Sequence, residues 1–270
     1  MSDTVYTVPP VERALRLLRH IGAGDTVANV SRTAASLGIN RTTLIRLLHT
    51  LEAERFIERR PEGAGWRLGL GAFTVAAEAL AAQDVVQVGS EVLAGLVERL
   101  GLSAHLAVLD ERDIVYLLRH TPNVPMVSNV RVGSRLPSYA TNMGRAILAH
   151  MPKASVRALF VHAPMKPITP QTPTNIDALM EQLCHDRDDG LAWSESYFEP
   201  GINSVAAPIF DSTGICIAAI NVTGRAEQFE TNRVQIGAAV RQAAQIASGR
   251  LGFSSSNRSC PWSVSISSAA

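Results

Sequence analysis

Apolar residues recur every three or four positions through the first fifty residues of the chain, which is the spacing of a helix with one buried face. The spacing predicts one helix that opens at Pro9 and Pro10, where proline is tolerated. It predicts a second helix over residues 30–37 and a third over residues 41–55. The first part of the chain is therefore expected to be a small helical bundle.

Two residues at predicted helix ends and a predicted hairpin make that expectation more specific. Gly38 stands where a C-cap glycine takes a left-handed conformation, and Asn40 stands where a side chain can cap the third helix. Two short strands at 56–60 and 65–69 follow, around a turn. Helix, tight turn, helix and hairpin in this order predict a winged helix-turn-helix.

Residues 70–100 return to a helical pattern, with a break near Gln83 and Asp84. This stretch is apolar and carries few charges, so it should pack on its own domain or against a second subunit.

Beyond Gly101 the pattern changes to alternating strands mixed with helices, which predicts an α+β domain with a mainly antiparallel sheet. The expected strands are 104–110, 113–119, 205–210 and 216–222, and the expected helices are 144–151, 155–160, 175–187 and 232–251. The predicted domains are a winged helix-turn-helix over 1–70, a linker helix over 71–83, the α+β domain over 84–252 and a disordered tail over 253–270.

Composition agrees with a soluble two-domain protein, because the 270 residues are 46% hydrophobic and 18% charged. No basic segment followed by an apolar run opens the chain, and the apolar run at 72–82 is too short to cross a bilayer. We therefore expect a cytoplasmic protein with no membrane partner. Three cysteines that lie far apart predict neither a disulfide framework nor a zinc site.

Charge is distributed unevenly. Up to Leu70 the chain carries ten arginines, no lysine and seven acidic residues, a net charge of +3, whereas the remainder carries −2. Arginine suits paired hydrogen bonds to phosphate and guanine, so this distribution favours a nucleic-acid partner for the first domain.

The third helix has the polar face that a recognition helix needs, opposite Leu44, Leu48 and Leu51. The alternative is that its polar residues are only the solvated face of a bundle. The residues that we predict to contact DNA are Arg32, Arg41, Thr42, Thr43, Arg46, His49, Arg59, Arg60 and Arg67.

Signals for catalysis are weak. Cys184, His185 and Asp186 are neighbours in a predicted helix and point in different directions, and no two histidines have metal-ligand spacing on one helix. We predict no enzyme, no metal and no cofactor. One alternative is a small hydrolase or transferase that uses Ser138, Tyr139 and Ser204, although no activating base is recognisable. A purely structural dimerisation protein is a third possibility.

Three separated stretches, 31–48, 131–149 and 199–209 with 218–224, resemble the IclR family of bacterial transcription regulators. The resemblance implies a winged helix, a linker helix and a GAF-like effector domain, assembled as a homodimer or homotetramer. It implies operator DNA and a small-molecule effector as partners, with RNA polymerase as a further candidate. Residues 133–139 look most like the branch that controls aromatic acid catabolism.

The same resemblance points to an effector pocket. Free amides at the helix start near residue 142 would favour a carboxylate. Family members often carry an aspartate at about Ser194, and its absence here suits an anionic effector. The alternative for Asn221 and Thr223 is that they are polar residues on a strand face exposed to solvent. The residues implied to bind the effector are Thr141, Asn142, Met143, Gly144, Ser204, Asn221 and Thr223. The effector, the operator, the sign of regulation and the choice between dimer and tetramer stay open.

Overall fold

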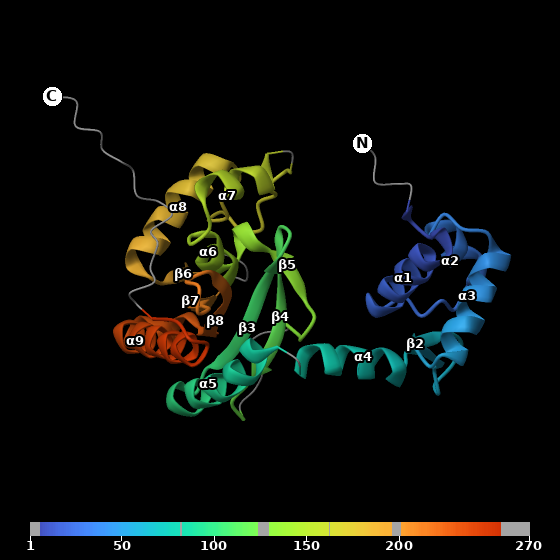
Figure 1. Cartoon of the computed structure of the whole chain (residues 1–270), viewed down its shortest axis with the longest axis horizontal. Coiled ribbons are helices and arrows are strands. Elements are labelled where there is room, and N and C mark those ends of the chain that lie inside the picture. Colours follow the sequence, from blue (N-terminus) through green and yellow to red (C-terminus); the bar gives the residue numbers. More distant parts are fainter. Residues whose placement is uncertain (1–5, 82, 124–129, 162, 196–200, 255–270) are drawn as a thin grey trace. The chain divides into compact units, whose positions relative to one another are not determined.

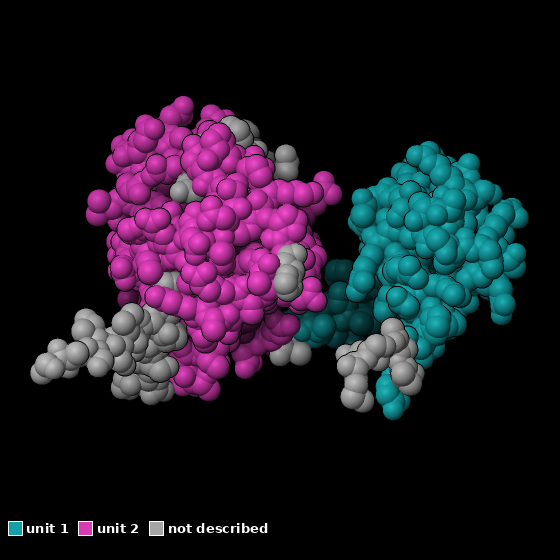
Figure 2. All heavy atoms as spheres, turned by 90° about the horizontal axis from the view of Figure 1, so that it is seen from above, with its two compact units in different colours: residues 1–82 teal, residues 83–270 magenta. Residues whose placement is uncertain are grey.

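The computed structural model describes residues 6–81, 83–123, 130–161, 163–195 and 201–254. The chain divides into two compact units, Met1–Ala82 and Gln83–Ala270 (Figures 1 and 2).

The N-terminal unit is a winged helix-turn-helix, as predicted. Its elements are α1 (Pro9–Gly22), α2 (Val30–Ser36), α3 (Arg41–Ala53), β1 (Ile57–Arg59), β2 (Trp66–Leu68) and α4 (Leu70–Ala81). The two strands form an antiparallel hairpin. The core lies between the three helices and this hairpin, and includes Leu17, Leu44, Leu48, Ile57 and Trp66.

The helix-turn-helix forms through the two signals noted in the sequence. Gly38 has φ +65°, a conformation that costs glycine little. The Oδ1 atom of Asn40 accepts the N–H of Thr43 at 2.7 Å and so caps the N-terminus of α3. Local chemistry thus sets the direction in which α3 leaves the turn.

The start of α4 is hydrogen-bonded to the short segment between α3 and β1. The N–H of Gly69 donates to the carbonyl of Phe56 and the N–H of Gly71 donates to the carbonyl of Arg55, both at 2.9 Å. A Cβ atom at Gly69 would lie 2.4 Å from the Arg55 oxygen, and one at Gly71 would lie 2.8 Å from it. Both glycines are therefore required for this close approach.

The C-terminal unit is built on one antiparallel sheet of six strands, in the order β5-β4-β3-β8-β7-β6. The strands are β3 (Ser103–Asp110), β4 (Asp113–His120), β5 (Arg135–Pro137), β6 (Ala192–Glu195), β7 (Ile202–Phe210) and β8 (Cys216–Arg225). The helices are α5 (Asp84–Leu100), the short 3₁₀ turn η2 (Ser138–Ala140), α6 (Asn142–Leu148), α7 (Lys153–Phe160), α8 (Ile176–Asp189) and α9 (Ala226–Arg250).

Helices cover both faces of the sheet (Figure 1). On one face α5 lies on β3 and β4, and α9 lies on β7 and β8. On the other face α6 crosses the central strands, and α7 and α8 pack around it. Four of the sheet residues in the cluster under α6 are alanines: Ala107, Ala192, Ala206 and Ala219. Small side chains let a helix approach the sheet closely.

Two strands were not expected from the sequence. β5 has three residues and ends at Pro137, and β6 has four residues, so neither is long enough to show a repeating pattern. Both lie at the edges of the sheet. The other expected strands and helices are present, with ends that differ by a few residues.

Phe253, which we assigned to the tail, packs on the fold: its ring stacks on that of Phe210 with centroids 5.1 Å apart. Residues 255–270 of the predicted tail lie outside the described residues. Within the described part of the chain, no single helix is both long and apolar enough to cross a membrane; α4 and α5 meet that test only when taken together.

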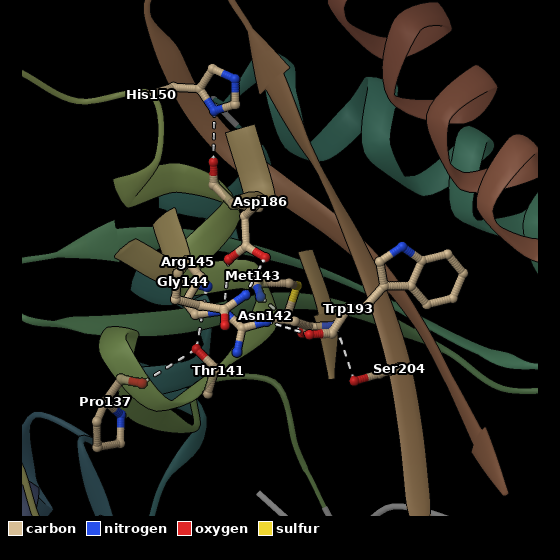
Figure 3. Close-up of polar contacts among 12 residues, drawn as sticks. Pro137, Thr141, Asn142, Met143, Gly144, Arg145, His150, Asp186, Trp193 and Ser204 are labelled. Atoms are coloured by element: carbon tan, nitrogen blue, oxygen red, sulfur yellow. Dashed lines mark hydrogen bonds and ion pairs between the residues drawn. The ribbon is translucent and has the colours of Figure 1, made fainter. Parts of the chain in front are cut away.

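A buried ion pair joins the helical layer to the edge of the sheet. The Nε atom of Arg145 donates to Oδ2 of Asp186 at 2.8 Å, and the arginine side chain is 0% exposed (Figure 3). The guanidinium also donates to the carbonyl of Trp193 in β6, and Gln182 donates to the other oxygen of Asp186 at 3.0 Å. The pKa of Asp186 is raised, because the effect of burial exceeds the lowering effect of Arg145 and Gln182.

We expect Arg145→Met to destabilise the C-terminal unit by about 3–5 kcal/mol, because it leaves the Asp186 carboxylate buried without its cation. Calorimetry on the full chain measures this as a lower transition temperature. The matched control is Arg157→Met, which removes an exposed pair with Asp177 and should cost less than about 1 kcal/mol. Equal small shifts in the two variants would contradict the structural role of the buried pair.

Candidate functional site

The outer face of α3 carries basic side chains that are not engaged elsewhere. Arg41 and Arg46 are exposed, and among the described residues neither makes an ion pair or a side-chain hydrogen bond. Thr42 and His49 are exposed on the same helix, and Arg32 is exposed on α2. Thr43 is half-buried, and its backbone N–H is used by the Asn40 cap. This face has the form of a recognition helix.

The arginines of the wing are held differently, because each has an acidic neighbour. Arg59 pairs with Glu52 at 3.0 Å, and its guanidinium lies over the ring of Trp66, 3.9 Å from the centroid. The sequence showed these arginines but not their partners. Arg59 is thus partly a packing residue, whereas the face of α3 keeps its charge available.

The remaining wing arginines also pair with exposed acidic side chains. Arg67 pairs with Glu58 across the hairpin at 2.7 Å, and Arg60 pairs with Glu62 at 3.5 Å. Exposed pairs of this kind are weak, so a phosphate can replace the carboxylate as partner.

In the C-terminal unit, a cavity of about 50 Å³ lies between α6 and the sheet. No lysine, arginine, aspartate or glutamate is among the described residues that line it. Its lining residues are His105, Tyr116, Val130, Leu136, Thr141, Asn142, Ser194, Ile202, Ser204, Asn221 and Thr223. The cavity is therefore uncharged but rich in hydroxyl and amide groups.

Strand register brings the polar residues of the cavity together. Ser194 in β6 lies opposite Ser204 in β7, and Ser204 lies opposite Thr223 in β8. In the next row, Asn221 lies opposite His105 in β3. Residues directly opposite each other in a sheet point to the same face, so side chains from four strands meet under α6.

Five of the seven residues implied to bind the effector line this cavity. Asn221 and Thr223 are buried there, which excludes the alternative that they are solvent-facing polarity. Asn142 joins them from α6, where its Nδ2 atom donates to Ser204 Oγ at 3.0 Å (Figure 3).

Met143 and Gly144 do not line the cavity. The Met143 side chain is buried in the core between α6 and the sheet, and Gly144 packs on η2, where a Cβ atom would lie 2.2 Å from the Ser138 oxygen. The expectation of free amides at the start of α6 is also wrong. The N–H of Met143 donates to Asn142 Oδ1 at 2.8 Å, and that of Gly144 donates to Thr141 Oγ1 at 3.2 Å.

His105, Tyr116 and Leu136 are cavity residues that the sequence did not single out. They come from β3, β4 and β5, which strand pairing places side by side in the same sheet as β8. The place of His105 within the mostly apolar strand β3 was a signal, because a buried histidine is unusual without a partner.

The residues of the hydrolase alternative do not form one site. The hydroxyl of Ser138 donates to the carbonyl of Arg112 at 2.7 Å, and that of Tyr139 donates to the carbonyl of Lys166 at 3.0 Å. Only Ser204 of the three lines the cavity. A larger hollow of about 410 Å³ between α7 and α8 is lined mostly by apolar groups and by Arg157, whose charge is paired with Asp177.

Comparison with known families decides the assignment. The model described as the bacterial transcriptional regulator IclR C-terminal domain matches residues 77–248, and the IclR helix-turn-helix domain matches residues 10–61. The chain belongs to the IclR family. Members of this family are transcriptional regulators and not enzymes, so the chain is a DNA-binding transcription regulator.

Individual relatives agree with the IclR assignment. The HTH-type transcriptional regulator XynR of Escherichia coli is 29% identical over 216 residues, which are 80% of this chain and 86% of XynR. The crystal structure of a transcriptional regulator from Rhodococcus sp. RHA1 has a TM-score of 0.80 at 26% identity, over 91% of this chain and 98% of that one. An IclR homologue from Microbacterium hydrocarbonoxydans, crystallised with 4-hydroxybenzoate, has a TM-score of 0.79 at 23% identity, over 90% and 98%.

The buried His105 makes the stability of the C-terminal unit depend on pH. Burial lowers the pKa of His105 to about 4. The hydrogen bond with Asn221 raises this pKa, and the positive charge of Arg119 lowers it further. Between pH 6.5 and pH 4 the unfolded chain therefore binds a proton at this position and the folded chain does not, so stability falls as the pH falls.

We expect the His105 contribution to cost about 2 kcal/mol between pH 7 and pH 5. Urea unfolding at both pH values measures the loss, which should be smaller by that amount in His105→Gln than in the parent protein. An unchanged pH dependence in the variant would show that His105 takes up its proton between pH 7 and pH 5 in the folded chain as it does in the unfolded chain.

Proposed function

We propose that this IclR-family regulator binds a pseudo-palindromic operator as a homodimer or homotetramer and that a small carboxylic acid controls it. Two recognition helices would enter successive major grooves of the duplex. The observation that carries the DNA part of the proposal is the exposed face of α3, where Arg41 and Arg46 have no partner among the described residues.

Pairing of two N-terminal units is supported by α4. None of its described residues is buried, and it exposes large apolar side chains: Leu70 is 60% exposed, Phe73 68% and Val75 56%. A helix so apolar is stable in water only when another surface covers it. The net charge of +3 up to Leu70 is also modest, so two units would hold DNA better than one. RNA polymerase is a further candidate partner, for the case of activation.

Effector binding is supported by the buried polar cavity. We propose Thr141, Asn142, Ser204, Asn221 and Thr223 as effector contacts. Neutral hydroxyl and amide donors can bind a carboxylate when several converge on it. An aromatic acid is the first candidate class, because a homologue of the same fold was crystallised with 4-hydroxybenzoate. The effector would change the affinity for DNA by favouring one arrangement of the oligomer.

We expect Arg46→Ala to weaken binding to the preferred operator by about 1–3 kcal/mol and to relax the sequence preference at one position. Arg60→Ala should weaken binding on all sequences and reduce the salt slope by about one. Selection of bound duplexes, followed by titration at several salt concentrations, measures both effects. Arg157→Ala in the other unit is the control for loss of one charge. No affinity for duplex DNA at low salt would end the proposal.

We expect a thermal-shift screen of carboxylic acids, phenolic acids first, to give a ligand that raises the transition temperature. A ligand at one hundred times its Kd stabilises the native state by about 2.7 kcal/mol. Asn221→Ala should weaken this response and leave operator binding intact, because Asn221 lies in the C-terminal unit. Equal loss of both activities would mean that Asn221 serves the fold alone.

A further inference from the structure

The side chains that line the cavity form a chain of hydrogen bonds from His105 to Ser204. A backbone N–H fixes which group donates and which accepts at each step. The N–H of Met143 can only donate, and its acceptor is Oδ1 of Asn142 at 2.8 Å. The oxygen of the Asn142 amide therefore faces this N–H. Its nitrogen then faces Ser204 and donates to Oγ at 3.0 Å.

The orientation of Asn142 sets that of Asn221. Nδ2 of Asn221 donates to Oδ1 of Asn142 at 3.3 Å, so the oxygen of the Asn221 amide faces His105. That oxygen lies 2.9 Å from Nδ1 of His105 and can only accept. The proton of the imidazole must therefore sit on Nδ1.

This leaves Nε2 of His105 as a bare acceptor. His105 is 1% exposed, and among the described residues its Nε2 has no hydrogen-bond partner. A buried polar atom without a partner is costly and uncommon, so Nε2 requires a donor from outside these residues, such as a water or a ligand. The low pKa of His105 keeps the ring neutral at ordinary pH and so keeps the lone pair available.

The two ends of the network differ in character. His105 lines the cavity, and because Nδ1 is engaged by Asn221, only Nε2 is left to face a ligand. At the other end Ser204 accepts from Asn142, so its own hydroxyl proton is free to donate into the cavity. The cavity thus offers an acceptor at His105 and a donor at Ser204.

We propose that the effector is a hydroxylated carboxylic acid, whose hydroxyl donates to Nε2 of His105 and whose carboxylate accepts from the hydroxyl of Ser204. This rests on the proposed function of the cavity as the effector site. An acid without the hydroxyl leaves Nε2 unpaired in a buried position and binds less well. The cavity volume of about 50 Å³ lies well below the roughly 300–1,000 Å³ of ordinary ligand sites, so the cavity as it stands has room only for the smallest acids of this class.

Calorimetric titration of the full-length protein with two matched pairs of acids tests the proposal: 4-hydroxybenzoate with benzoate, and glycolate with acetate. In at least one pair the hydroxylated acid should bind about tenfold or more tightly than its partner. His105→Phe keeps the ring and removes the acceptor, so it should abolish that preference by weakening the hydroxylated acid alone. His185→Phe makes the same replacement at an exposed position of α8 that does not line the cavity, so it is the matched control and should retain the preference.

A spectroscopic readout keeps the test independent of the variants. In protein labelled with ¹⁵N-histidine, the Nε2 resonance of His105 should be that of an unprotonated nitrogen and should shift with the hydroxylated acid only. Equal binding of both members of each pair, with an unmoved Nε2 resonance, would overturn the inference and leave the effector proposal standing. If none of the four acids binds, the carboxylate part of the proposed function fails and this inference fails with it.

Discussion

The buried ion pair between Arg145 and Asp186 holds the parts of the C-terminal unit on which the cavity depends. Arg145 lies in α6, Asp186 in α8 and the carbonyl that completes the contact in β6. Removing two charges from water is costly, and the cost is offset only where the geometry and the further hydrogen bonds are good. The pair therefore permits one arrangement of helix and sheet edge, and this arrangement fixes Asn142, three residues earlier on the same helix.

Close approach of α6 to the sheet then makes the cavity small. Alanines on four strands lie below the helix, and Gly144 lets η2 pack against it. In a space of this kind every amide must find a partner, which orders the network from Met143 to His105. The same burial that lowers the pKa of His105 keeps its second nitrogen an unprotonated acceptor, which has no partner among the described residues.

The N-terminal unit follows a different physical logic, because its function lies on an exposed face. Its core needs only apolar residues at helical spacing, and the caps at Gly38 and Asn40 set the turn. The recognition face keeps free arginines, while the wing balances its arginines with Glu52, Glu58 and Glu62. Gly69 and Gly71 hold the start of α4 against the segment between α3 and β1.

The sequence by itself determined the winged helix-turn-helix, the polar face of α3 and the α+β character of the second unit. These features follow from the spacing of apolar residues, from helix caps and from turns. Each of these signals involves residues that are close together in the sequence. Along one strand it also placed Asn221 and Thr223 on a common face. The sequence missed β5 and β6, and it did not reveal the acids that bind the wing arginines or the use of the α6 amides by Thr141 and Asn142. Only the tertiary structure brought His105 beside Asn221, because a pairing 116 residues apart depends on strand order and register, and these are decided by packing of the whole sheet.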